Sequence, residues 1–172
     1  MIREILTKAV LSKGVIESSN VEKIELRKGV SKLIGCWIIN SHYLTIVENF
    51  KVYLEGSYDV HIWYAINGDT DTAIEKKTIT YKEEFQFDEN FNTDECDYKL
   101  YCNEYPHCSS LVLEGENALI NVEKKYSIDA IGETKLMVDV NQSLIKGYTA
   151  ILCAGSDDNV KKLTDIDRKS VV

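Results

Sequence analysis

The sequence lacks any long apolar run and any excess of basic residues, and each absence excludes a class of function. No stretch approaches the roughly 18 consecutive apolar residues that a membrane span needs. The formal net charge is −8, so nothing indicates a basic face that grips phosphate backbones, and nucleic acid is not an expected partner. The first residues, MIREILTKAVLSKG, interleave charged and apolar side chains, unlike a signal peptide. We therefore expect a cytosolic product without a membrane span.

Signatures of common catalytic sites are also missing. The chain contains neither a glycine-rich phosphate loop nor a G-x-G-x-x-G turn, and GETK at 132–135 lacks the preceding glycines. EGSYD and AGSDD do not supply the G-x-S-x-G of a nucleophile elbow. One cluster, Cys102, His107 and Cys108, is worth weighing as a zinc site, but no C-x-x-C pair occurs anywhere. We expect no enzyme activity, no cofactor and no metal.

What is present is the composition of a folded globular protein. Of the 172 residues, 44% are hydrophobic and 28% are charged, which is far from the composition of a disordered chain. A domain near this size hides roughly two thirds of its unfolded surface, so the chain can build a core. We expect an N-terminal amphipathic helix at 1–14, a β-sandwich domain at 15–145, and a C-terminal segment with a mobile tail at 146–172.

The helix prediction rests on spacing. A glycine at position 14 suits the end of a helix. The preceding apolar residues recur at intervals of three and four, as on one face of a helix. These residues are Ile2, Ile5, Leu6, Ala9 and Val10.

The stretch FKVYLEGSYDVHIWYAI, residues 50–66, alternates apolar and polar side chains with a period of two, which predicts a strand. As one straight strand it would reach roughly 56 Å at about 3.3 Å per residue, whereas a compact domain of this length spans about 40 Å. The strand must therefore bend, break or project. We expect a bulge or a corner between sheets at Gly56 and Ser57.

Two turn signals predict hairpins on either side of an irregular middle. The Asn-Gly pair at 67–68 is a strong hairpin signal. A second hairpin turns at 115–117 and returns along a strand with one apolar face. That face comprises Ala118, Ile120, Val122, Tyr126, Ile128 and Ala130.

A faint internal echo supports the same fold class. LEGSYDVHI at 54–62 aligns with VEKKYSIDA at 122–130 and keeps an acidic residue, a tyrosine and the apolar phase. Two similar β units packed face to face would explain this echo. The predicted fold class is therefore mainly β, an antiparallel β-sandwich with a short N-terminal helix.

The chain has five cysteines, an odd number that leaves at least one unpaired in a monomer. Without an export signal, we expect reduced thiols when the protein is made. Cys36 and Cys153 are interpreted as small apolar packing groups. Cys96, Cys102 and Cys108 lie in the polar region around the single proline, where the hypothesis of disulfides between subunits in a long-lived layer stays open.

Acidic residues gather between 83 and 97, and such a run is typical of a solvated face or a docking surface. A hydrolase would need two carboxyl groups that face each other across a cleft, and the sequence leaves that spacing open. Tyr53 and Trp63 stand on the polar phase of 50–66, so the second face of this strand is partly covered, by the domain or by another subunit. A solvent-exposed aromatic platform there would favour a carbohydrate-binding module.

Four blocks occur in order: REILTKAVLSKG at 3–14, IGCWIINSHY at 34–43, VYLEGSYDVHIWY at 52–64 and IGETKLMVDV at 131–140. Together they resemble the outer spore-coat morphogenetic proteins of endospore-forming bacteria, the spore coat protein E (CotE) family, over about residues 3–140. One departure concerns the C-terminus. Family members end in a densely acidic tail, whereas residues 141–172 mix acids with Lys and Arg.

The resemblance implies a non-enzymatic, self-assembling scaffold of the endospore outer coat. Similar proteins are made in the mother-cell cytoplasm during sporulation, surround the forespore, and become part of the spore coat. The partners implied are further copies of the chain in a homo-oligomer, basement-layer proteins and outer-coat proteins. The motif positions carried over, with a structural or an assembly role, are Trp37, Asn40, Tyr43, Glu55, Gly56, Tyr58, Asp59, Trp63, Tyr64, Gly132, Glu133 and Thr134.

Overall fold

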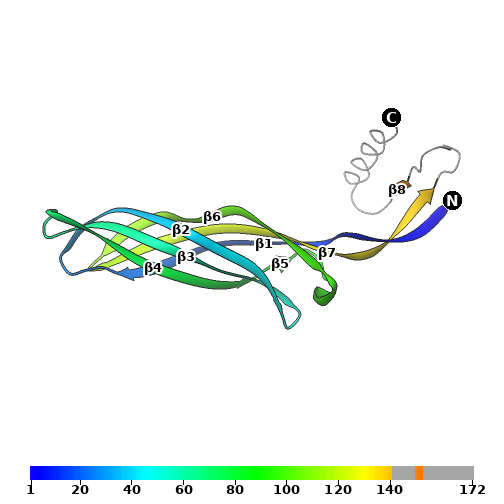
Figure 1. The fold of residues 1–172 in the computed structure, drawn as a ribbon, viewed down its shortest axis with the longest axis horizontal. Coiled ribbons are helices and arrows are strands. Elements are labelled where there is room, and N and C mark those ends of the chain that lie inside the picture. Colours follow the sequence, from blue (N-terminus) through cyan, green and yellow to red (C-terminus); the bar gives the residue numbers. More distant parts are fainter. Residues whose placement is uncertain (141–149, 153–172) are drawn as a thin grey trace, which may run out of the picture. The chain divides into compact units, whose positions relative to one another are not determined.

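The computed structural model describes residues 1–140 and 150–152, most of which lie in β-strands (Figure 1). The predicted tail at 146–172 therefore lies outside the described residues, apart from 150–152. The elements are β1 (Ile2–Glu25), β2 (Val30–Glu48), β3 (Lys51–Ile66), β4 (Asp71–Glu84), β5 (Gln86–Phe87), the 3₁₀ turn η1 (Thr93–Glu95), β6 (Asp97–Glu114), β7 (Asn117–Val140) and β8 (Ala150–Leu152).

Two sheets form the fold, and the predicted mainly-β sandwich is confirmed. One sheet has the strand order β2-β3-β4, and the other has the order β5-β1-β7-β6 with β8 paired to β7. The chain divides into two compact units, one at 11–130 and the other formed by 1–10 with 131–172. The strands β1 and β7 contribute residues to both units, and the sandwich belongs to 11–130.

The predicted helix at 1–14 is wrong, because these residues begin β1. Apolar residues at 2, 6 and 10 fit a two-residue alternation as well as a helical spacing, so pairing with β7 decides the outcome. Near the start of β1, the Met1 amino group lies 3.0 Å from Asp139 Oδ1 on β7. Gly14 ends no helix: a Cβ there would meet Ile128 Cγ2 at 2.9 Å, so glycine permits a close approach of side chains.

The long alternating stretch forms β3, which passes through Gly56 and Ser57 without a break. Its pairing with β4 stays in register throughout. The predicted bulge is therefore not at Gly56 and Ser57: the register shifts lie on the neighbouring strand β2, and the one nearest to Gly56 is between Ile39 and His42. Asn40 stands at this bulge with a φ of 54°, in the left-handed region.

Both predicted hairpins are confirmed, and a third exists. Asn67 and Gly68 join β3 to β4 with φ values of 54° and 65°, as a tight hairpin turn requires. Gly115, with a φ of 60°, begins the turn between β6 and β7. The hairpin between β2 and β3 turns through Asn49 and Phe50, with φ values of 49° and 62°. A phenylalanine rarely adopts a positive φ, so the sequence did not predict a turn at this position.

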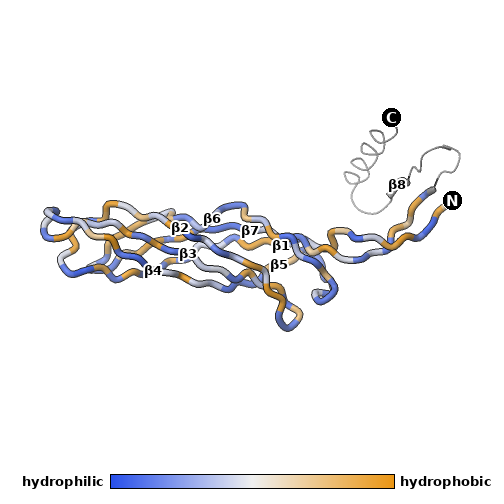
Figure 2. Tube along the Cα trace, in the orientation of Figure 1, coloured by the Kyte–Doolittle hydropathy of each residue, from blue (hydrophilic) through white to orange (hydrophobic). Residues whose placement is uncertain are grey.

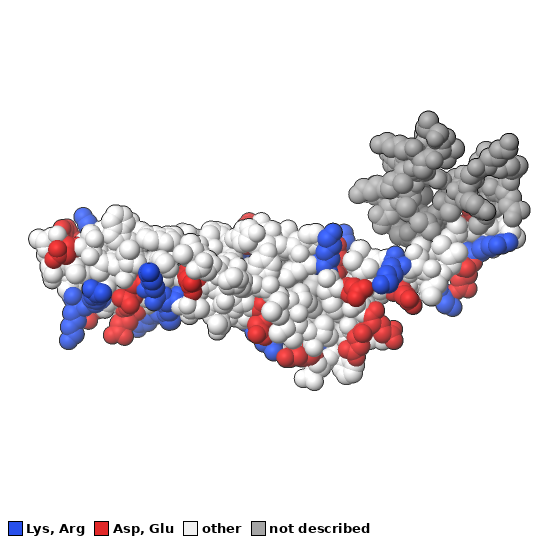
Figure 3. All heavy atoms as spheres, viewed as in Figure 1, with Lys and Arg blue, Asp and Glu red and all other residues white. Residues whose placement is uncertain are grey.

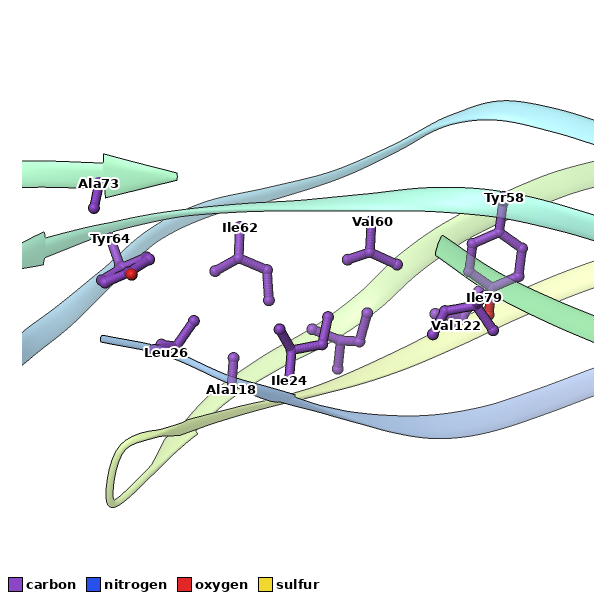
Figure 4. Close-up of a cluster of buried hydrophobic side chains, with 11 residues drawn as sticks. Ile24, Leu26, Tyr58, Val60, Ile62, Tyr64, Ala73, Ile79, Ala118 and Val122 are labelled. Carbon is purple, nitrogen blue, oxygen red and sulfur yellow. The ribbon is translucent and has the colours of Figure 1, made fainter. Parts of the chain in front are cut away.

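The core lies between the sheets and follows the two-residue alternation (Figure 2). All six predicted inward residues of β7 are 0% exposed, which confirms that face. Figure 4 shows the inward side chains of β3 opposite those of β1 and β7, with Val60 and Ile62 above Ile24. The structure explains the internal echo. Its two segments lie in β3 and β7, and each of these strands has a neighbouring strand on both sides in its sheet. Tyr58 and Tyr126, the echoed tyrosines, are both buried.

Candidate functional site

The outward face of the β2-β3-β4 sheet carries both tryptophans of the chain. Trp37 is paired with His61, and Trp63 is paired with Ile74. Directly opposed residues of antiparallel strands project from the same face, so these four side chains share one surface. We call the apolar members of this surface the outer-face patch: Trp37, Ile39, Trp63 and Ile74, with exposed fractions of 38%, 40%, 40% and 46%.

The outer-face patch is open rather than roofed by the domain itself. The Trp37 and His61 rings are tilted at 49° with centroids 5.7 Å apart, so they support each other without covering the surface. Gly35 lies opposite Trp63, and a Cβ added there would meet no atom within 4 Å. Figure 3 shows few charged side chains where Figure 1 labels β2 and β6, whereas the strand register also places Asp59, His61 and Lys76 on the outward face. Exposed aromatic groups bordered by polar side chains are typical of a recognition surface.

The β2 bulge beside the outer-face patch is held by a carboxylate. Asn40 Nδ2 donates to Asp59 Oδ2 at 2.9 Å, and Thr78 Oγ1 donates to Asp59 Oδ1 at 2.6 Å. These hydrogen bonds, the one from Thr78 foremost, lower the pKa of Asp59 because they favour its charged form. The motif pair Asn40 and Asp59 therefore joins β2 to β3, and Thr78 adds β4.

Four other motif positions serve the interior of the sandwich: Tyr43, Gly56, Tyr58 and Tyr64. The Tyr43 ring packs edge-on against Tyr126 with centroids 5.0 Å apart. Tyr58 and Tyr64 are 2% and 0% exposed. A Cβ on Gly56 would meet the Tyr81 hydroxyl and lie 2.6 Å from the His42 carbonyl oxygen, so only glycine fits. These four residues therefore contribute to the packing of the interior and not to an exposed surface.

The structure thus places the motif positions in different parts of the molecule, which the sequence alone did not distinguish. It brings Trp37, Asn40, Glu55, Asp59 and Trp63 to the outward face of one sheet. Gly132, Glu133 and Thr134 lie elsewhere, on the part of β7 that belongs to the unit of 1–10 and 131–172.

Sequence reasoning missed a buried lysine on the inward face of β7. Lys124 is 2% exposed, and its phase matches that of the apolar residues on either side of it. Its Nζ atom lies 3.0 Å from Glu83 Oε1, 2.8 Å from Ser18 Oγ and 4.5 Å from the centroid of the Tyr81 ring. The sequence did contain a signal, a lysine at a position whose neighbours in phase are apolar. Because a lysine is rarely buried without a partner, this position predicts a buried ion pair.

The acid-rich segment at 83–97 is partly structural. Glu83 neutralises Lys124, as described above. Asp88 accepts hydrogen bonds from Ser12 Oγ at 2.7 Å and from the Lys13 backbone nitrogen at 2.9 Å, and these contacts, with the Lys13 bond foremost, lower its pKa. Exposed acids remain in this segment, namely Glu89, Asp94, Glu95 and Asp97.

The candidate cross-linking cysteines lie in different surroundings. The Cys96 thiol donates to the Asn92 carbonyl oxygen at 3.3 Å. Burial raises the pKa of Cys102, and Cys108 packs against the core. Within 1–140 and 150–152, no three His, Cys, Asp or Glu side chains come together as metal ligands, so the weighed zinc cluster has no geometric support there.

A groove at one end of the sandwich bears on the hydrolase alternative. It has a volume of about 680 Å³ and runs between β1 and β4. Glu25 and Glu75 both line it, but so do four cationic side chains, Lys23, Arg27, Lys76 and Lys77. The groove therefore presents two carboxylates among four cations, which is not the pair of carboxyl groups facing each other alone that the hydrolase alternative requires.

The fold and the outer-face patch together define a class: a β-sandwich with exposed aromatic side chains on the outward face of one sheet. The chain belongs to the outer spore coat protein E (CotE) family, whose family model matches residues 1–171. The resemblance read from four sequence blocks is thereby confirmed, and membership implies a role in the spore coat of a sporulating cell. Comparison with curated proteins and with solved structures gave no match. In the part of the chain that the structure describes, no helix has the length and apolarity of a membrane span.

Proposed function

We propose that this protein is a non-enzymatic, self-assembling scaffold of the endospore outer coat, and that the outer-face patch is one of its self-association surfaces. The observation that carries the proposal is the exposure of Trp37 and Trp63 on one face. Tryptophan combines a large apolar area with a polar tip, so it contributes strongly when an interface buries it. Family membership supplies the setting, the outer spore coat.

A layer needs more than one kind of contact. A closed two-fold contact stops at a dimer, so the scaffold requires a second interface in another direction to give higher assemblies. The outer strand β4 of the three-stranded sheet offers backbone groups for edge-to-edge pairing. Modest contacts suffice, because many of them act together once copies are concentrated around the forespore.

The proposed life cycle begins in the mother-cell cytoplasm and ends in the coat. The net charge of −8 keeps free subunits apart until their local concentration rises. Basement-layer proteins and outer-coat proteins are the proposed partners. The exposed acids at 89–97 are the proposed docking surface in place of the densely acidic tail that other family members carry. Disulfides between subunits through Cys96, Cys102 or Cys108 would reinforce the finished layer.

The decisive experiment removes the aromatic surface and leaves the core alone. A Trp37→Thr/Trp63→Thr variant should lose the large species that the wild type forms, as measured by light scattering and electron microscopy across protein and salt concentrations. Threonine keeps the strand propensity of these positions, so the variant should remain folded by circular dichroism.

The matched control removes an exposed aromatic group outside the patch. Phe50 is 75% exposed at the hairpin tip, and asparagine tolerates its positive φ. Phe50→Asn should therefore assemble like the wild type. A wild-type protein that stays monomeric at high concentration, or a double-tryptophan variant that assembles normally, would contradict the proposal.

The exposed tryptophans also keep one alternative in view, a carbohydrate-binding module. Trp63 and Asp59, whose carboxylate accepts hydrogen bonds, lie on the same face of β3, four residues apart. Sugar binding commonly combines an aromatic platform with such polar groups. Binding of soluble peptidoglycan fragments or glucans, measured by calorimetry and abolished in the double-tryptophan variant, would favour this function. A subunit that assembles without binding these sugars favours the scaffold.

A further inference from the structure

Two free thiols lie next to each other where the sheets meet along one side of the sandwich. Cys36 belongs to β2 and Cys108 belongs to β6, and both are half-buried. The strands β2 and β6 contact each other although they belong to different sheets. Both cysteines pack against the same core cluster, which includes Val60 and Ile62. The fold therefore brings together two cysteines that are far apart in the sequence.

The electrostatics of Cys36 agree with this proximity. Burial raises the pKa of Cys36 to about 12, and the charge and hydrogen bonding of the neighbouring Cys108 thiol add to the effect. A second thiol acts in this way only at short range. The Cys108 thiol itself donates to the Ser110 carbonyl oxygen at 3.2 Å, which orients it beside the sheet edge.

The other described cysteines have oxygen neighbours instead. The Cys96 thiol contacts the Asn92 carbonyl oxygen, and Cys102 interacts with the Tyr126 hydroxyl. The Cys36–Cys108 pair is thus distinguished by the sulfur that each residue has beside it.

We propose that Cys36 and Cys108 are a site of oxidative modification, where a disulfide bond within one chain joins the β2-β3-β4 sheet to β6 of the other sheet. This inference does not depend on self-assembly. It assigns Cys108 a partner in its own chain, which leaves Cys96 and Cys102 for bonds between chains.

The chemistry is thiol–disulfide exchange with a low-molecular-weight disulfide, RSSR. The Cys108 thiolate attacks one sulfur of RSSR, which forms a mixed disulfide and releases RS⁻. The Cys36 thiolate then attacks the Cys108 sulfur, forms the protein disulfide and releases the second RS⁻. The two protein thiols lose two electrons and two protons, and the oxidant becomes two RSH. Because the pKa of Cys36 is high, the second step is slow near neutral pH and accelerates as the pH rises.

Closing a loop of about 70 residues restricts the unfolded chain and stabilises the sandwich. The expected rise in the midpoint of thermal unfolding is about 8 °C for a domain of this size. Disulfide bonds form and persist in oxidising environments, so the bond is expected after exposure to an oxidant and not in a reducing cytoplasm.

The test uses the full chain with Cys96, Cys102 and Cys153 replaced by serine, so that only the proposed pair remains. After treatment with oxidised glutathione at pH 8.5, both thiols should resist alkylation under denaturing conditions. The chain should run as a single copy on a non-reducing gel. Mass spectrometry should find the tryptic peptides 33–51 and 100–124 joined, and dithiothreitol should reverse both the link and the rise in the unfolding midpoint.

Two controls make the outcome decisive. Adding Cys36→Ser or Cys108→Ser to this background should abolish the joined peptides and the rise in the unfolding midpoint, while circular dichroism confirms that the strands are retained. The proposal is overturned if both thiols remain open to alkylation after prolonged oxidation. It is equally overturned if the only disulfides formed join two chains into a dimer on the gel.

Discussion

The two faces of the β2-β3-β4 sheet obey the same alternation but differ in what they contain. On the inward face, Tyr58 and Tyr64 are 2% and 0% exposed, whereas Trp37 and Trp63 on the outward face are 38% and 40% exposed. Tyrosines with a hydroxyl group are thus buried, and the larger and more apolar tryptophans are left in contact with solvent. Apolar burial alone would favour the opposite choice.

The motif positions shared with the family therefore include residues of two kinds, those that form the core and those that lie on the outer surface. The inward positions form the sandwich, and their hydroxyl groups find partners there: the Tyr64 hydroxyl accepts from the Arg27 backbone nitrogen at 3.1 Å, and the Tyr81 and Tyr126 hydroxyl groups lie 3.2 Å apart. The outward positions leave apolar surface in contact with water, which is expected if a second surface covers it. Changes on the inward face should therefore affect folding, and changes on the outward face should affect recognition.

The largest effect is expected at the buried ion pair on the inward side. Glu83→Ala leaves the Lys124 ammonium group buried without its counter-charge, so the free energy of unfolding should fall by about 3–5 kcal/mol. Urea denaturation measures this change. Glu84→Ala, which removes the exposed partner of Lys51, is the control and should change the free energy of unfolding far less, because solvent screens an exposed ion pair. Equal losses in the two variants would show that the buried pair has no special weight.

A smaller effect is expected at Gly56, where an added methyl group would overlap the Tyr81 side chain and the His42 carbonyl oxygen. Gly56→Ala should lower the free energy of unfolding by about 1–3 kcal/mol, the usual range for overpacking. Gly35→Ala on the adjacent strand is the matched control, because a Cβ there meets no atom within 4 Å. If Gly35→Ala destabilises the protein as much as Gly56→Ala does, close packing is not the reason for glycine at 56.

The smallest effect is expected on the outward face and depends on pH. The folded pKa of Asp59 is lowered from its ordinary value of 3.8, so its hydrogen bonds stabilise the fold above that value and are lost as the pH falls through the folded pKa. The wild type should thus exceed Asp59→Asn in unfolding free energy at pH 7, and the difference should shrink below about pH 4. Thermal unfolding at pH 7, 5 and 3 measures this convergence. A constant difference would assign the effect to something other than ionisation.

Much of the fold could be predicted because its signals are local. The period of two along 50–66 and 118–130 predicted which side chains face inward, and the Asn-Gly pair at 67–68 predicted a turn. The turn at Asn49 and Phe50 could not be predicted, because a phenylalanine with a φ of 62° contradicts local preference and is held there by the strands on either side. The prediction of a helix at 1–14 was wrong because a distant strand decides the conformation of this segment. That strand, β7, begins more than a hundred residues later in the chain.

The candidate site could be predicted only in part. The four sequence blocks marked Trp37 and Trp63 together with Tyr58 and Tyr64, but nothing local told packing positions from surface positions. The two-residue alternation along β3 places Trp63 and Tyr64 on opposite faces of the sheet. Placing Trp37 beside His61 also requires the pairing register of β2 with β3, which a bulge in β2 shifts.

By itself, the sequence determined the strand periodicity, two of the hairpin turns and the family to which the chain belongs. Each of these depends on residues close together in the chain or on the order of short blocks. The tertiary structure alone decided that the N-terminal segment is a strand, that Lys124 meets Glu83, and that Cys36 lies beside Cys108. These outcomes depend on which distant strands pair and which faces meet, and the free energy of such contacts exists only once the two sheets have packed together.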